Sequence, residues 1–89
     1  MTFSEFCLAA RQYAMMTGAS VTSWGRTYKH NTDVGGVAYS AHRFWLACDF
    51  VYDEPGHEPE RIALARRLGL KLLPEGDHHH AQPLDWTAG

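Results

Sequence analysis

The sequence predicts a small α+β fold. Its 89 residues are enough for one domain, residues 1–89, with a thin hydrophobic core. Two segments have the three-and-four spacing of apolar residues that is typical of amphipathic helices, and four short segments have strand composition. Their order along the chain is helix, strand, strand, helix, strand, strand. Mixed orders of this kind are typical of the α+β class.

The first helix is predicted from Phe3 onwards. Thr2 and Glu5 have the spacing of a capping box, in which each side chain accepts a hydrogen bond from the other residue's backbone. Gly18 is placed to end the helix in a left-handed conformation. The apolar positions that define its buried face are Phe3, Phe6, Cys7, Ala10, Tyr13 and Ala14.

The segment after this helix predicts two strands joined by a long polar loop. Residues 21–24 are β-branched and aromatic, as is typical of strands, and residues 46–52 have similar composition. In the second strand Asp49 and Val51 would lie on one face, because successive side chains of a strand alternate. The loop contains Gly35 and Gly36, whose conformational freedom suits either a backbone that wraps a site or an ordinary connection.

The second half begins with a turn at residues 53–56. Pro59 stands at a first-turn position and Glu58 and Glu60 favour the positive end of a helix dipole, so a helix is predicted from Glu58 to Gly69. A strand at 70–73, a turn at 74–76 and a strand at 78–82 follow.

Composition excludes several classes of protein. Two cysteines, Cys7 and Cys48, are too few for a disulfide-dense scaffold, and we expect both to be reduced and buried. The net charge is −2 and the basic residues are scattered, so nucleic acid and anionic membranes are not expected partners. The first residues lack a signal peptide, and no apolar run is long enough for membrane insertion. We therefore expect synthesis in the cytoplasm.

Three segments together predict a metal site. His42 and Asp49 offer one nitrogen and one oxygen ligand, and Asp77-His78-His79-His80 supplies further imidazoles. In a strand, His78 and His80 would share a face while His79 points the other way. Three ligands with an open fourth position are typical of catalytic zinc. A run of three histidines can also be a purification-tag remnant, but here it lies inside a strand-like segment.

A zinc hydrolase also needs a general base and a cation for the oxyanion. Asp77 stands three residues before His80, and Glu75 stands three before His78; we favour Asp77 because Gly76 lets the chain bend there. Both acids are also compatible with a solvated turn. For the cation, Arg26 is the first candidate and Arg43 the second.

These segments resemble a known family. Ser23-Trp24-Gly25-Arg26-Thr27, residues 30–36, the pattern Ser40-x-His42-x6-Asp49 and Asp77-His78-x-His80 are similar to the zinc D-Ala-D-Ala carboxypeptidases. This family, also called the LAS peptidases, includes phage L-alanyl-D-glutamate endopeptidases and shares its fold with the hedgehog signalling domain. The resemblance covers about residues 21–83. It implies a small antiparallel sheet with helices packed on one side.

The resemblance also implies roles for individual residues. The zinc ligands would be His42, Asp49 and His80, and Asp77 would be the catalytic carboxylate assisted by His78. Arg26 and Ser40 would contact the substrate or the tetrahedral intermediate. Two departures from the family pattern are Trp45, which replaces a glycine, and the order of residues 23–26. A tryptophan there would fill space beside the metal.

The implied activity is zinc-dependent hydrolysis of peptidoglycan stem peptides, at L-Ala-D-Glu or D-Ala-D-Ala type bonds. Such an enzyme would act on the bacterial cell wall after release from the cell or as part of a phage particle. A second interpretation is a non-enzymatic domain of the same fold, with structural zinc, that serves assembly or binding. A third is a histidine-rich metal carrier.

Overall fold

The computed structural model describes residues 1–24 and 46–85. Within these residues it contains two helices and a four-stranded antiparallel sheet, which confirms the α+β prediction. The elements are α1 (Phe3–Thr17), β1 (Ala19–Ser23), β2 (Cys48–Tyr52), α3 (Glu58–Arg67), β3 (Leu70–Glu75) and β4 (His78–Pro83). No helix among the described residues is long and apolar enough to cross a membrane.

Helix α1 begins and ends as its sequence predicts. The Thr2 side chain accepts a hydrogen bond from the Glu5 backbone N–H at 3.1 Å, and the Thr2 backbone N–H donates to Glu5 Oε1 at 2.7 Å. Gly18 ends the helix at φ 70°, a left-handed conformation in which a glycine has no steric penalty. Both ends of this helix are therefore determined by local sequence.

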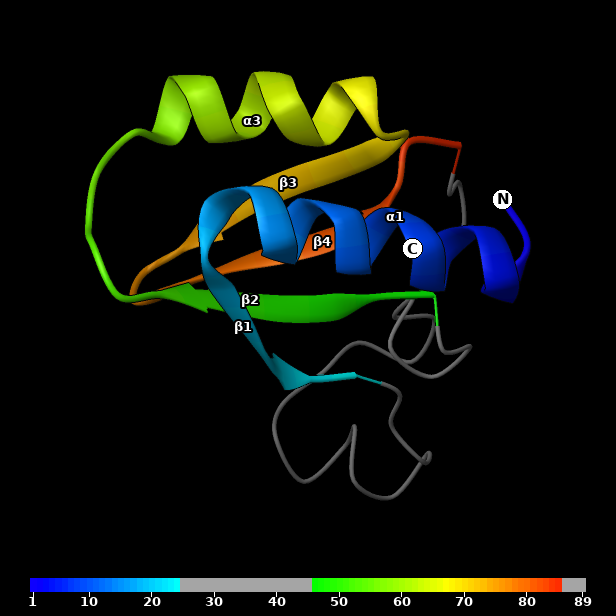
Figure 1. Ribbon diagram of the computed structural model, residues 1–89, viewed down its shortest axis with the longest axis horizontal. Coiled ribbons are helices and arrows are strands. Elements are labelled where there is room, and N and C mark those ends of the chain that lie inside the picture. The colour runs from blue at the N-terminus through cyan, green and yellow to red at the C-terminus, as the bar shows by residue number, and fades with distance from the viewer. Residues whose placement is uncertain (25–45, 86–89) are drawn as a thin grey trace.

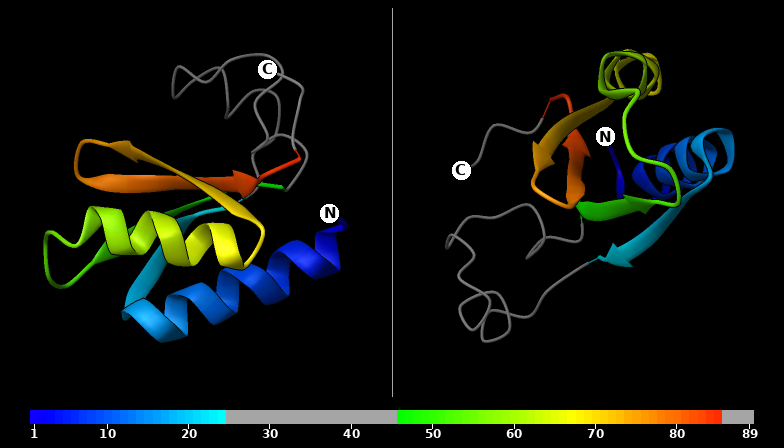
Figure 2. Two further views of the ribbon diagram at one scale, coloured as in Figure 1. Left: turned by 90° about the horizontal axis from the view of Figure 1, so that it is seen from above. Right: turned by 90° about the vertical axis from the view of Figure 1, so that its left-hand side faces the viewer.

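The sheet has the strand order β1-β2-β4-β3, so the last strand of the chain, β4, lies between β2 and β3. Strand β4 is central and pairs with both β2 and β3. Both helices cover the same face of this sheet, as the views in Figures 1 and 2 show. The predicted zinc ligands Asp49 of β2 and His80 of β4 lie on the other face of the sheet.

The hydrophobic core lies between the helices and the sheet. Tyr13 of α1 packs against Phe50 of β2, with ring centroids 4.8 Å apart, and Phe6 of α1 belongs to the same cluster; all three side chains are fully buried. Each buried aromatic side chain removes a large apolar area from water, so these rings contribute strongly to the stability of the core. Cys48 is buried as expected, whereas Cys7 is only partly buried.

The turn predicted at 74–76 begins two residues later than expected. Strand β3 continues through Pro74 to Glu75, and the tight turn is formed by Gly76 and Asp77. Proline is accepted in an edge strand, where its missing N–H need not break the ladder. The longer hairpin pairs Glu75 directly with His78, which brings both predicted acids next to the histidine run.

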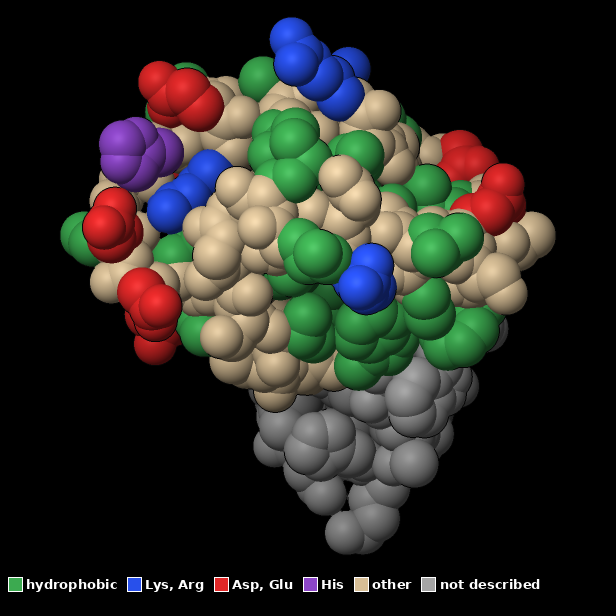
Figure 3. All heavy atoms as spheres, viewed as in Figure 1, with side chains coloured by type: hydrophobic (Ala, Val, Ile, Leu, Met, Phe, Trp, Pro, Cys, Tyr) green, Lys and Arg blue, Asp and Glu red, His purple; other side chains and the backbone are tan. Residues whose placement is uncertain are grey.

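The helix-covered face carries charges of both signs. Figure 3 shows hydrophobic side chains gathered over its middle, with the basic side chains separate from one another. No continuous basic patch is visible on this face within the described residues.

Candidate metal and acid–base site

Strand pairing brings Asp49 and His80 together. The two residues are direct partners in the β2–β4 register, so their side chains lie side by side on the sheet face away from the helices. Asp49 Oδ1 lies 3.4 Å from His80 Nδ1. Asp49 is 7% and His80 is 9% exposed. Two of the three predicted zinc ligands are therefore adjacent and buried.

The separation of these two atoms is suited to a shared metal ion. Zinc is held by nitrogen and oxygen at about 2.0–2.2 Å with tetrahedral geometry, which places neighbouring ligand atoms roughly 3.4 Å apart. The 3.4 Å between Asp49 Oδ1 and His80 Nδ1 is the length of an ion pair between these side chains and is also compatible with two ligands of one ion. Among the described residues, no group of three or more His, Cys, Asp or Glu side chains is placed to hold a metal ion. The third predicted ligand, His42, lies outside the described residues.

The second nitrogen of His80 is also fixed. His80 Nε2 lies 2.7 Å from Gln82 Oε1, and the two residues share a strand face because they are two positions apart. Burial lowers the pKa of His80, but the contacts with Asp49 and Gln82 and the charge of Glu75 outweigh it, so the pKa lies above its usual value. The sequence interpretation did not include Gln82. The alternation of side chains along the strand is the signal that could have indicated it.

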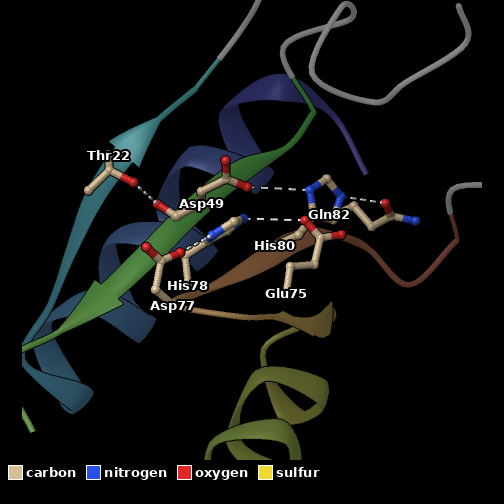
Figure 4. A network of polar contacts seen from close by, with 7 residues as sticks. All are labelled: Thr22, Asp49, Glu75, Asp77, His78, His80 and Gln82. Atoms are coloured by element: carbon tan, nitrogen blue, oxygen red, sulfur yellow. Dashed lines mark hydrogen bonds and ion pairs between the residues drawn. The ribbon is translucent and has the colours of Figure 1, made fainter. Parts of the chain in front are cut away.

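His78 lies between the two candidate bases. Its Nδ1 is 3.0 Å from Asp77 Oδ1, and its Nε2 is 3.3 Å from Glu75 Oε1 (Figure 4). The hydrogen bond with Asp77 is the main reason that the pKa of His78 is raised, and it lowers the pKa of Asp77. Carboxylates can only accept hydrogen bonds, so this arrangement favours an imidazolium with a proton on each nitrogen.

The two candidate bases differ in exposure. The Asp77 side chain is 98% exposed, and that of Glu75 is 50% exposed. Asp77 stands in the turn, where its carboxylate is open to solvent, while Glu75 belongs to β3. Both contacts with His78 are present together. The choice between the two acids as the base therefore stays a prediction.

His79 points to the opposite face, as alternation predicts. Its Nδ1 lies 2.9 Å from the Tyr52 hydroxyl, and its Nε2 lies 3.4 Å from Glu58 Oε1. A pocket of about 250 Å³ borders these residues and also reaches Asp77 and His78 at the hairpin turn. The sequence interpretation did not include Tyr52 and Glu58, because neither has a sequence motif that links it to the histidine run.

The remaining predicted site residues lie outside the described residues. These are Arg26, Ser40 and His42, together with the alternative cation Arg43 and the substitution Trp45. Their predicted roles in oxyanion stabilisation, substrate contact and metal binding stay predictions. Comparison of the chain with models of protein families, with curated proteins and with solved structures gave no match.

Proposed function

We propose that this chain is a zinc-dependent peptidase that hydrolyses peptidoglycan stem peptides. The observation that carries the proposal is the buried Asp49–His80 pair, whose oxygen and nitrogen are separated by the distance expected of two zinc ligands. The Asp77–His78 pair beside it supplies a carboxylate suited to proton transfer. The family resemblance of the sequence provides the substrate class and the hedgehog-type fold, and both belong to the proposal.

In this proposal Asp49, His80 and His42 hold the zinc. A zinc ion held there would act as a Lewis acid and lower the pKa of water to about 7. The buried Asp49 and His80 orient the ligand atoms, and Gln82 holds the far nitrogen of the His80 ring. A hydrogen bond to the nitrogen that does not bind the metal normally fixes the orientation of a ligating histidine.

The protein side chains that move protons lie at the hairpin turn. Asp77 accepts the proton from the attacking water and can return it to the leaving amine. His78 holds the Asp77 carboxylate by a hydrogen bond and keeps it ionised, because the same contact lowers the Asp77 pKa. Arg26 would stabilise the oxyanion, and Ser40 would contact the substrate.

The direct test is digestion of purified peptidoglycan by zinc-loaded protein, with mass spectrometry of the released peptides. Wild type should release stem-peptide fragments, and His80→Ala should release none. His57→Asn is the matched control, because His57 is exposed and adopts a left-handed φ of 61°, which asparagine tolerates. Bound zinc without any released peptide would refute the peptidase and support a structural zinc domain.

The same assay separates the two types of bond. We expect endopeptidase cleavage within the stem, because so small a domain has little material to close both ends of a groove. An amidated stem peptide should then be cleaved as well as the free acid. Cleavage restricted to the free acid, with D-alanine as the sole product, would show carboxypeptidase activity instead.

A further inference from the structure

His79 joins three elements of the fold through one side chain. It lies in β4, its Nδ1 contacts Tyr52 at the end of β2, and its Nε2 contacts Glu58 at the start of α3. His79 is 6% exposed. A buried imidazole with both nitrogens engaged can hold only one orientation. The backbone of β4 at residue 79 is thereby fixed relative to β2 and α3.

The contact to Tyr52 is itself held in place. The Tyr52 hydroxyl lies 2.6 Å from that of Tyr13 in α1, and the Arg61 guanidinium carbon lies 3.8 Å from the centre of the Tyr52 ring. Arg61 also donates hydrogen bonds to the carbonyl oxygens of Gly56 at 2.7 Å and Glu54 at 3.0 Å. The Tyr52 ring therefore has a fixed position on the helix-covered face.

When the His79 ring is neutral, only one assignment of donors and acceptors is consistent with all of these contacts. The Glu58 carboxylate can only accept, so His79 Nε2 carries the proton and Nδ1 is the acceptor. Tyr52 then donates to Nδ1, and Tyr13 donates to the Tyr52 oxygen. Burial raises the pKa of both tyrosines, so each hydroxyl keeps the proton that this order requires. The order fixes the tautomer of His79 as well as its orientation.

We propose that His79 is a positioning residue that, through Tyr52 and Glu58 on one face of the sheet, determines how His78 and His80 are presented on the other. Neighbouring strand residues share one backbone, so a rotation at residue 79 turns both flanking imidazoles away from their partners. His80 would move relative to Asp49, at present 3.4 Å away, and His78 relative to Asp77, at present 3.0 Å away. His79 is then dispensable as a ligand but not for ligand geometry.

The test removes one tyrosine hydroxyl at a time. Tyr52→Phe deletes the hydroxyl that contacts both His79 and Tyr13, while the control Tyr13→Phe deletes only the Tyr13–Tyr52 contact and leaves the Tyr52–His79 contact in place. Glu58→Gln, with the exposed Glu60→Gln as control, tests the second nitrogen. All variants are compared at a temperature where circular dichroism shows each to be folded.

Two readouts distinguish positioning from a general loss of stability. In zinc-free protein, the ¹⁵N shifts of the His80 ring should change in Tyr52→Phe and stay unchanged in Tyr13→Phe. The zinc dissociation constant, a readout that rests on the proposed function, should rise about tenfold in Tyr52→Phe, at the lower end of the effect of outer contacts on metal affinity. It should rise less than about twofold in Tyr13→Phe, which keeps the contact.

The two readouts test the positioning role and the proposed function separately. Unchanged His80 shifts in both Tyr52→Phe and Glu58→Gln would overturn the positioning role, as would equal changes in Tyr52→Phe and Tyr13→Phe. If wild type binds no zinc, the proposed function fails, and the ring shifts of His80 in zinc-free protein still decide whether His79 positions it.

Discussion

The Asp49–His80 pair should behave as one energetic unit. Both residues are at least 90% buried and are direct cross-strand partners. Removing one partner of a buried pair typically costs about 3–5 kcal/mol, because the other is left without its partner. Asp49→Asn and His80→Gln keep some hydrogen-bonding capacity, so we expect about 3 kcal/mol from each in zinc-free protein. A domain of this length has a total stability of about 4–13 kcal/mol, so both variants are measurably weakened.

The quantity that tests this is the coupling free energy between the two substitutions. In a double-mutant cycle the double variant should be about 1–3 kcal/mol more stable than the sum of the single effects predicts, because contacting residues lose the same interaction. Urea unfolding followed by circular dichroism gives each free energy of unfolding. The control cycle combines Asp53→Asn and His57→Asn, which are exposed and should each change stability by less than about 0.5 kcal/mol.

Zinc provides the second half of the same experiment. At a free zinc concentration one hundred times the dissociation constant, wild type should gain about 2.7 kcal/mol, since zinc binds the folded state. At that same zinc concentration the Asp49→Asn and His80→Gln variants should gain much less, because each has lost a ligand. Additivity of the two substitutions within about 0.5 kcal/mol in zinc-free protein, together with equal zinc stabilisation of wild type and variants, would refute the reasoning.

Three further predictions concern the base, a thiol and the core. Asp77→Asn should keep zinc in equilibrium dialysis and lose about 10²- to 10⁴-fold in turnover, while Glu75→Gln is mild; the reverse order would identify Glu75 as the base. Burial raises the pKa of Cys48 to about 12, so native protein at pH 8 should label with a thiol reagent at Cys7 first, and labelling of Cys48 as fast as in urea would contradict this. Phe50→Ala should cost about 3–5 kcal/mol in urea unfolding, since the ring is fully buried; less than about 1 kcal/mol would be inconsistent with its place in the core.

The sequence by itself determined the elements whose signals are local. The capping box of Thr2 and Glu5 and the left-handed Gly18 set the ends of α1, because each contact lies within one turn of the helix. The alternation along β4 placed His79 on the face opposite to His78 and His80. The end of β3 was missed, because an edge strand accepts Pro74 where composition alone indicates a turn.

Only the tertiary structure decided which distant residues are neighbours. The β2–β4 register that pairs Asp49 with His80, and the β3–β4 hairpin that brings Glu75 to His78, depend on strand order and on shifts of a single residue. The contact of His79 with Tyr52 follows from the same order, since it requires β4 to lie beside β2. Residue type indicated which side chains can bind a metal or carry a proton. Long-range pairing of strands, which no local pattern encodes, determined which of them meet.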